Sequence, residues 1–226
     1  MRVDTPRRVH ENVNFNQMIH PDTELRFISP EIGYGVFATK LIPRGSITWV
    51  PDQLDQKFTL AELERLHPMS RQLAEKYSFI DLDGYWVLCW DHGRFMNHSC
   101  EANCLSTGFP FEIAVDDIVP GSELTCDYGL LNLQYPLECT CGARECRKQI
   151  GRENVFSCSE AWDVWISGAF PLIKTVAQPL WPLLCNPEEV EAAIAGRIPV
   201  PSCRVQLFPP LPQTYPVNGN YHLARW

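Results

Sequence analysis

The sequence has no long hydrophobic run and few basic residues. No stretch of about 18 apolar residues occurs, so we expect no membrane-spanning helix. Residues 1–10 are polar and basic, without the apolar segment of a signal peptide. The 19 lysines and arginines are outnumbered by 27 acidic residues, for a formal net charge of -8. This balance argues against direct binding of nucleic-acid phosphates. It suits a basic protein or peptide partner, although an acidic surface also serves solubility alone.

Disulfide bonds are not expected either. Ten cysteines without a secretory signal indicate a reducing, intracellular compartment, either nucleus or cytoplasm, where they act as metal ligands or buried thiols. The chain is 45% hydrophobic and 20% charged, which excludes wholesale disorder. A chain of 226 residues forms one domain with appendages, or at most two small domains.

Short strand patterns dominate the chain up to about residue 150. We expect strands at 25–29, 33–42, 46–50, 77–82, 85–89, 104–107, 112–116 and 123–128. Pro43-Arg44-Gly45 predicts a hairpin between the second and third of these, and Asp83-Gly84 predicts another between 77–82 and 85–89. Thr59 is a suitable cap for a short helix. The core is therefore expected to be mostly β.

Helical signals appear after Gly151. Apolar residues recur at helical spacing at Trp162, Trp165, Ile166, Ala169, Phe170 and Ile173. Asn186-Pro187-Glu188-Glu189 predicts a helix start with Asn186 as its cap, and Gly196 predicts its end. Six prolines between 199 and 216 favour an extended strap. We expect residues 157–196 to pack on the rest of the chain, because their tryptophans would otherwise form an exposed apolar patch.

Three cysteines have the spacing of metal ligands. Cys139, Cys141 and Cys146 form C-x-C-x4-C, and Gly142 permits a tight bend after the second. Three thiolates leave a tetrahedral zinc site one ligand short. On this spacing alone, buried or redox-active cysteines are an equally good interpretation. Six further cysteines are scattered and are expected to pack: Cys89, Cys104, Cys126, Cys158, Cys185 and Cys203.

Four segments in a fixed order carry a resemblance to a known family. They are Gly33-Tyr34-Gly35-Val36-Phe37-Ala38, Arg94-Phe95-Met96-Asn97-His98-Ser99-Cys100, Glu123-Leu124-Thr125-Cys126-Asp127-Tyr128-Gly129, and Cys139-Thr140-Cys141 through Cys146-Arg147. Together they resemble SET-domain protein-lysine methyltransferases with a post-SET zinc-binding segment. The resemblance covers residues 25–150 and says nothing about 151–226.

The resemblance implies a fold, a domain division and an activity. The fold would be mainly β, a SET domain with a knot-like crossing of the Asn-His and Asp-Tyr segments. The divisions would be an N-terminal segment 1–24, a SET domain 25–133, a post-SET segment 134–151, and a helical and proline-rich extension 152–226. The activity would be methyl transfer from S-adenosylmethionine to lysine in a histone tail or another protein, in a basic segment, without nucleic acid or membrane as partner.

The resemblance also assigns roles to residues. Cofactor contacts would come from Ile32, Gly33, Tyr34, Gly35, Tyr77, Arg94, Phe95, Asn97, His98 and Thr140. The substrate channel would be lined by Tyr77, Phe79, Cys126 and Tyr128. One structural zinc ion would be bound by Cys139, Cys141 and Cys146, with Cys100 as the fourth ligand. Without the family pattern, Tyr77 and Tyr128 would be interpreted as buried core tyrosines.

Tyr128 is the expected catalytic residue. Methyl transfer needs a neutral amine, and a free lysine with a pKa of about 10.4 is almost wholly charged at neutral pH. Burial and the cofactor's positive sulfur would lower that pKa, so this reasoning requires no dedicated general base. The Tyr128 hydroxyl would then orient the amine. Cys126 stands where related enzymes have Tyr or Phe, and its small size predicts di- or trimethyl-lysine as the product.

Two departures and two alternatives complete the interpretation. Ala102 replaces a proline common in the family pattern, and no cysteine-dense segment precedes Cys89. The main alternative is a non-catalytic SET-like interaction module, against which the presence of Asn97, His98 and Tyr128 argues. The other is a zinc-stabilised interaction protein whose residues 209–212, Pro-Pro-Leu-Pro, bind an aromatic groove.

Overall fold

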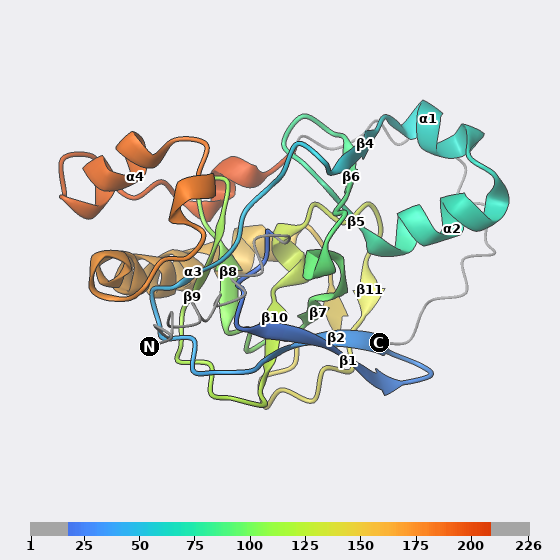
Figure 1. Cartoon of the computed structure of the whole chain (residues 1–226). Coiled ribbons are helices and arrows are strands. Elements are labelled where there is room, and N and C mark those ends of the chain that lie inside the picture. Colours follow the sequence, from blue (N-terminus) through green and yellow to red (C-terminus); the bar gives the residue numbers. More distant parts are fainter. Residues whose placement is uncertain (1–17, 209–226) are drawn as a thin grey trace, which may run out of the picture.

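A computed structural model of the protein describes residues 18–208, which are rich in short strands (Figure 1). The strands are β1 Thr23–Ser29, β2 Gly33–Ala38, β3 Ile47–Trp49, β4 Gln56–Phe58, β5 Ser78–Ile80, β6 Trp86–Leu88, β7 Asn97–His98, β8 Cys104–Ser106, β9 Glu112–Ala114, β10 Glu123–Cys126, β11 Leu137–Glu138 and β12 Gln149–Ile150. The α-helices are α1 Leu60–Arg65, α2 Pro68–Tyr77, α3 Asn154–Ala169 and α4 Pro187–Ile194. Short 3-10 helices are η1 His92–Phe95, η2 Tyr128–Leu130, η3 Phe170–Thr175, η4 Trp181–Leu183 and η5 Cys203–Gln206. The predicted, mainly β fold class is confirmed.

The strands form four small sheets. Their orders are β1-β2-β10-β7, β3-β9-β8, β4-β6-β5 and β11-β12. Most pairs are antiparallel, but β10 and β7 run parallel, with Thr125 opposite Asn97 and Cys126 opposite His98. This pairing places the Asn-His segment beside the strand that leads into Tyr128. The knot-like crossing of the two segments stays a prediction.

One predicted hairpin is confirmed and the other is wrong. β5 and β6 pair antiparallel around Asp83-Gly84, where Gly84 adopts a φ of 85° that favours glycine. The turn at 43–45 does not join two strands of one hairpin, because β3 pairs with β9 while β2 pairs with β1 and β10. The amide of Gly45 donates to the carbonyl of Ala114, so this turn passes the chain from one sheet to another.

The helix ends follow the predicted positions but not always the predicted contacts. Thr59 caps α1 in a reciprocal capping box with Glu62, as expected for this pair. Asn186 precedes α4 but accepts no capping hydrogen bond, and its side-chain amide donates to Glu189 instead. Asn186 therefore occupies the predicted N-cap position without a side-chain capping bond; the helix begins at Pro187, and its C-cap residue Ala195 directly precedes Gly196.

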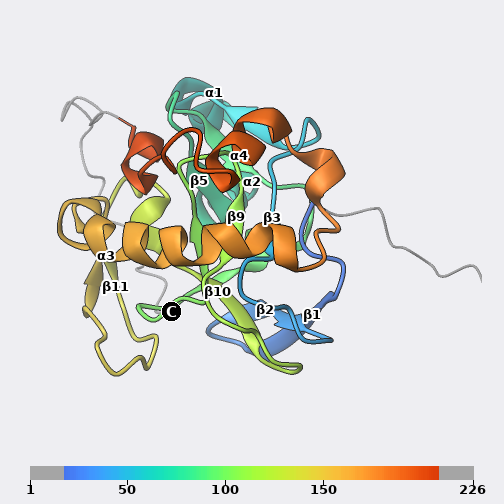
Figure 2. The same ribbon diagram turned by 90° about the vertical axis from the view of Figure 1, so that its left-hand side faces the viewer.

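The C-terminal extension completes the largest apolar cluster. Trp162 and Ile166 of α3 pack with Ile47, Leu105 and Ile113 of the β3-β9-β8 sheet, and Figure 2 shows α3 lying across this sheet. The predicted packing of a helical extension is confirmed. The predicted strap is not extended throughout, because η5 interrupts it, and its part beyond residue 208 lies outside the described residues.

Within residues 18–208, no helix combines the length and the apolar character needed to cross a bilayer.

Candidate functional site

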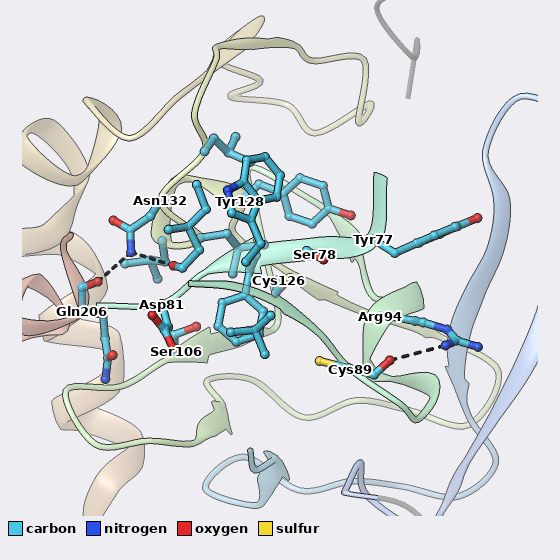
Figure 3. A pocket seen from close by; sticks show the side chains of 18 of the residues that line it. Tyr77, Ser78, Asp81, Cys89, Arg94, Ser106, Cys126, Tyr128, Asn132 and Gln206 are labelled. Carbon is cyan, nitrogen blue, oxygen red and sulfur yellow. Dashed lines mark hydrogen bonds between the residues drawn. The ribbon is translucent and has the colours of Figure 1, made fainter. Parts of the chain in front are cut away.

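A cavity of about 940 Å³ lies between the β4-β6-β5 sheet, the end of β10 and the C-terminal extension. The four predicted channel residues, Tyr77, Phe79, Cys126 and Tyr128, all line it. Figure 3 shows Cys126 and Tyr128 near its middle, with Tyr77 toward one end and Gln206 toward the other. The structure thus brings together side chains from β5, β10, η2 and the extension, which are far apart in the sequence.

Tyr128 is fixed at both its backbone and its hydroxyl. The hydroxyl donates to the carbonyl of Met96 at 2.9 Å, and the backbone amide donates to Nδ1 of His98 at 3.1 Å. Burial, reinforced by Cys126 and by nearby acidic groups, raises the pKa of Tyr128 well above its ordinary value. The hydroxyl therefore stays protonated at neutral pH and acts as a hydrogen-bonding group.

Arg147 ties the cysteine segment to the end of β10. One nitrogen of its guanidinium, Nη2, donates to both carboxylate oxygens of Asp127, at 2.7 and 2.8 Å, and the opposite charges strengthen this contact. The same guanidinium lies over the ring of Trp162 on α3, 5.8 Å from its centroid. Our sequence reasoning did not select Arg147, although its place directly after Cys146 was a usable signal.

The predicted zinc ligands gather in one place. The ligand atoms of His98, Cys100, Cys139 and Cys141 all lie within 4.8 Å of one another. The sulfur of Cys146 is 3.6 Å from that of Cys139, and the sulfur of Cys100 is 3.8 Å from that of Cys139. A tetrahedral zinc ion with bonds of about 2.3 Å separates its sulfur ligands by about 3.8 Å. These spacings fit a metal site, but they add His98 to the predicted group and leave Cys146 at its edge.

The thiol of Cys141 is suited to metal binding. Burial acts to raise its pKa, but hydrogen bonds from the amides of Cys100 and Ala143 and from neighbouring thiols lower it to about 7. A thiol with that pKa is substantially ionised at neutral pH, and the thiolate is the form that binds metals.

Aromatic rings and amide groups meet where cofactor contacts were predicted. Tyr34 is 45% exposed, and its ring lies 5.9 Å from that of Phe95, which in turn lies 5.2 Å from Tyr77. The side-chain amide of Asn97 donates to the carbonyl of Tyr34 and to the carboxylate of Glu123. The exposed ring of Tyr34 and the half-buried rings of Phe95 and Tyr77 offer a stacking surface beside polar backbone groups.

The remaining predicted cofactor contacts are distributed around this surface. A Cβ on Gly35 would crowd the side chains of Glu123, Ile28 and Asn97, which would have to move to accept a larger residue. Ile32 lies in the turn before β2, where its amide donates to Ser29, and Gly33 follows it with a φ of 90°. Arg94 lines the cavity and donates to the carbonyl of Cys89. Thr140 is exposed between two of the clustered cysteines, Cys139 and Cys141.

One cavity residue was missed by sequence reasoning. Glu112 is buried at the start of β9, and one of its oxygens accepts a hydrogen bond from Ser106. A charged residue directly before the apolar pair Ile113-Ala114 was the available signal.

Comparison with known proteins identifies the central part of the chain. The family model described as SET domain matches residues 33–129. Residues 33–129 form a SET domain. The matched segment contains every predicted channel residue, from Tyr77 to Tyr128, and the Asn97-His98 pair.

The chain is also similar to curated proteins of known name. It is 30% identical over 168 residues to the histone-lysine N-methyltransferase SETD2 of Homo sapiens, covering 66% of this chain and 6% of that protein. It is 31% identical over 142 residues to the histone-lysine N-methyltransferase ASHH2 of Arabidopsis thaliana, covering 56% of this chain and 8% of that protein. The chain thus spans only a small part of the length of these relatives.

One solved structure is similar to part of the chain. The methyltransferase domain of human histone-lysine N-methyltransferase SETMAR is 22% identical, with a TM-score of 0.41, covering 60% of this chain and 59% of that chain.

Proposed function

We propose that the protein transfers methyl groups from S-adenosylmethionine to the ε-amine of lysine in a protein substrate. One observation carries this proposal: within a SET domain, Tyr128 lines a single cavity together with Tyr77, Phe79 and Cys126. The relatives named as histone-lysine N-methyltransferases support the same reaction. The intact Tyr128 hydroxyl and its fixed hydrogen bond favour an enzyme over a non-catalytic module.

The residues around Tyr34 fit the proposed cofactor. When bound, S-adenosylmethionine supplies an electrophilic methyl group on a positively charged sulfur. The exposed ring of Tyr34 and the half-buried ring of Phe95 suit the adenine, since aromatic faces stack on bases. The backbone of 33–35 and the Asn97-His98 pair would hold the polar parts of the molecule, with Ile32, Arg94 and Thr140 at its border.

The chain's own contribution is to position the amine and exclude water. The carbonyl of Met96 fixes the direction of the Tyr128 hydroxyl, whose oxygen remains free to accept a hydrogen bond from a substrate amine. The apolar walls given by Phe79 and Trp49 keep the site dry, which strengthens such interactions. Correct orientation of two reactants is the main source of acceleration in this kind of reaction.

The charge of the cavity wall favours a basic substrate segment. Its acidic lining residues are Asp52, Asp55, Glu75, Asp81, Asp83 and Glu112, and its basic ones are Lys57, Lys76 and Arg94. Negative charges in a recessed site attract and orient cationic partners. We infer that the substrate is a lysine within a basic segment, in a histone tail or in another protein.

Cys126 bears on the product. Its side chain lines the cavity two residues before Tyr128 and is buried. A thiol is smaller than a tyrosine ring and only a weak donor, so it leaves room for a methylated amine to react again. We infer that the product is di- or trimethyl-lysine.

We also propose one structural zinc ion, bound by Cys100, Cys139, Cys141 and Cys146. Metal analysis of protein purified without chelator is expected to show about one zinc per chain. Cys141→Ser is expected to lower both zinc content and cofactor affinity, because the site joins the cysteine segment to the Asn97-His98 strand. The exposed Cys185→Ser is the matched control and should keep both. Full cofactor affinity in zinc-free protein would contradict this role.

The free thiols are consistent with an intracellular protein. The ten cysteines are free thiols, and thiols persist in a reducing compartment. We infer an intracellular site of action, without distinguishing nucleus from cytoplasm.

The function is tested with labelled S-adenosylmethionine and an array of peptides that each contain one lysine, flanked by arginine, alanine or glutamate. We expect label on lysine peptides, strongest with arginine flanks, and none when the lysine is replaced by arginine. Equal labelling with all flanks would contradict the role of the acidic wall. Absence of label from folded, zinc-loaded protein would contradict the function.

A further inference from the structure

Three neighbouring strands present a row of side chains to the cavity. In the β3-β9-β8 sheet, Glu112 pairs with Trp49 on one side and with Ser106 on the other. Directly paired residues of adjacent strands point to the same face of a sheet. All three residues line the cavity that contains Cys126 and Tyr128. The carboxylate of Glu112 therefore belongs to the wall of the proposed active site.

Glu112 is an unusual residue for this position. It is only 6% exposed, and its Oε1 accepts a hydrogen bond from the hydroxyl of Ser106 at 3.1 Å. Its Oε2 is buried and has no hydrogen-bond partner within residues 18–208. A buried carboxylate with one unsatisfied oxygen destabilises a fold, and such groups occur where function requires them.

Two other carboxylates of the cavity wall already have partners. Asp55 accepts hydrogen bonds from the amides of Trp90 and Asp52. Asp81 pairs with Lys57 at 2.9 Å and accepts backbone amides on its other oxygen. Glu112 is thus the buried carboxylate of this wall with an oxygen left for a ligand.

The groups around Glu112 are neutral at physiological pH. Cys89, Cys104, Cys126 and Tyr128 have pKa values that burial raises well above neutrality, and Glu112 is among the charges acting on each of them. Burial likewise raises the pKa of Glu112 to about 7, while the hydrogen bond from Ser106 acts in the opposite direction. No cation within residues 18–208 contributes to that pKa. Glu112 can therefore both take up and release a proton near neutral pH.

We propose that Glu112 is the proton acceptor that converts the ammonium group of the substrate lysine into the neutral amine. This inference rests on the proposed lysine methyl transfer. One N–H bond of the ammonium breaks, its electron pair stays on nitrogen, and an O–H bond forms on the carboxylate. The cation and the anion become two neutral groups, which a dry cavity favours. The protonated Glu112 later releases its proton to water.

The expected increase in the rate of methyl transfer is large. A lysine with a pKa of about 10.4 is neutral in only about one molecule in 2,500 at pH 7. A base with a pKa near the working pH, held within reach of the amine, accelerates such reactions by about 10²- to 10⁴-fold.

The test compares the wild type with Glu112→Gln, which keeps the shape and removes the proton acceptor. Rates on a labelled array peptide are measured from pH 5.5 to pH 9. We expect the wild-type rate to rise through about pH 7 and level off. We expect the rate of Glu112→Gln to be about 10²-fold lower at pH 7. We expect this rate to rise about tenfold per pH unit, because it follows the fraction of the substrate lysine that is neutral. Glu160→Gln, on the exposed face of α3, is the matched control.

A second substrate separates a chemical role from a structural one. A peptide whose lysine is replaced by thialysine carries a less basic amine, and it should restore much of the rate of Glu112→Gln while changing the wild type little. A variant with the wild-type rate and pH profile would overturn this inference and leave the proposed function intact. A variant that stays inactive at high pH and with thialysine would overturn it too. A wild type that methylates no peptide would overturn both.

Discussion

The two faces of the β3-β9-β8 sheet have different roles, since one packs in the core and the other lines the cavity. One face carries Ile47, Leu105 and Ile113, which are fully buried against α3. The other carries Trp49, Ser106 and Glu112, which line the cavity. Side chains alternate along β8 and β9, and an irregularity in β3 between Ile47 and Trp49 lets these two residues point to opposite faces. Strands of only three residues can therefore supply core packing on one side and chemistry on the other. Stability is concentrated on the face toward α3, and proposed function on the face toward the cavity.

The largest effect on stability is expected on the α3 face. Trp162 is 2% exposed within the main apolar cluster, so Trp162→Ala should lower the free energy of unfolding by about 3–5 kcal/mol. Trp165 lies on the same helix but is 43% exposed, and Trp165→Ala should cost less than about 1 kcal/mol. Urea denaturation measures both. Equal losses would mean that α3 does not pack on the sheet in this orientation.

Tyr128→Phe should lower turnover strongly and stability only slightly. The substitution removes a hydroxyl that positions the amine, so turnover should fall by about 10²-fold or more. The free energy of unfolding should change by only about 1 kcal/mol, the size of one lost hydrogen bond. Turnover and urea denaturation are measured on the same preparation, with Tyr85→Phe outside the cavity as control. A variant with wild-type turnover would remove Tyr128 from the mechanism.

Glu112→Gln should make the protein more stable at high pH. The pKa of Glu112 is about 7 in the folded state against an ordinary value of 4.5, so the stabilising protonation is complete below pH 4.5 and is lost as the pH rises through 7. The variant has no carboxyl group at this position, so its free energy of unfolding does not fall in this way. The difference in free energy of unfolding between the variant and the wild type should grow to at most about 3 kcal/mol at pH 8. Thermal unfolding at pH 5 and pH 8 tests this, with Glu160→Gln as control. If the stability difference between the variant and the wild type does not grow from pH 5 to pH 8, Glu112 is not buried as a carboxylate.

Cys126→Tyr should have the smallest effect on rate and the clearest effect on product. The ring would fill space beside Tyr128 and crowd a methylated amine, so product should shift from di- or trimethyl-lysine to monomethyl-lysine. Mass spectrometry at saturating cofactor reads the product directly. Monomethyl-lysine from wild type and variant alike would refute the role of Cys126.

The sequence predicted what short-range chemistry and motifs determine. Asp83-Gly84 and Thr59 act through neighbouring residues, and both were assigned correctly. The turn at 43–45 was misassigned because its outcome depends on β9, some 70 residues away along the chain. Glu112 was missed for the same reason: which face it occupies follows from long-range pairing with Trp49 and Ser106. Cys139, Cys141 and Cys146 were found by their spacing and Cys100 through the family resemblance, but the approach of His98 needed the parallel pairing of β7 with β10.

The most direct test of this account uses S-adenosylmethionine with a deuterated methyl group. The folded, zinc-loaded protein is incubated with lysine peptides that have arginine flanks, and the products are sequenced by mass spectrometry. The account predicts deuterated methyl groups on the ε-nitrogen of lysine. If protein that binds the cofactor leaves every lysine unmodified, the cavity around Tyr128 is not a methyl-transfer site and the central claim is wrong.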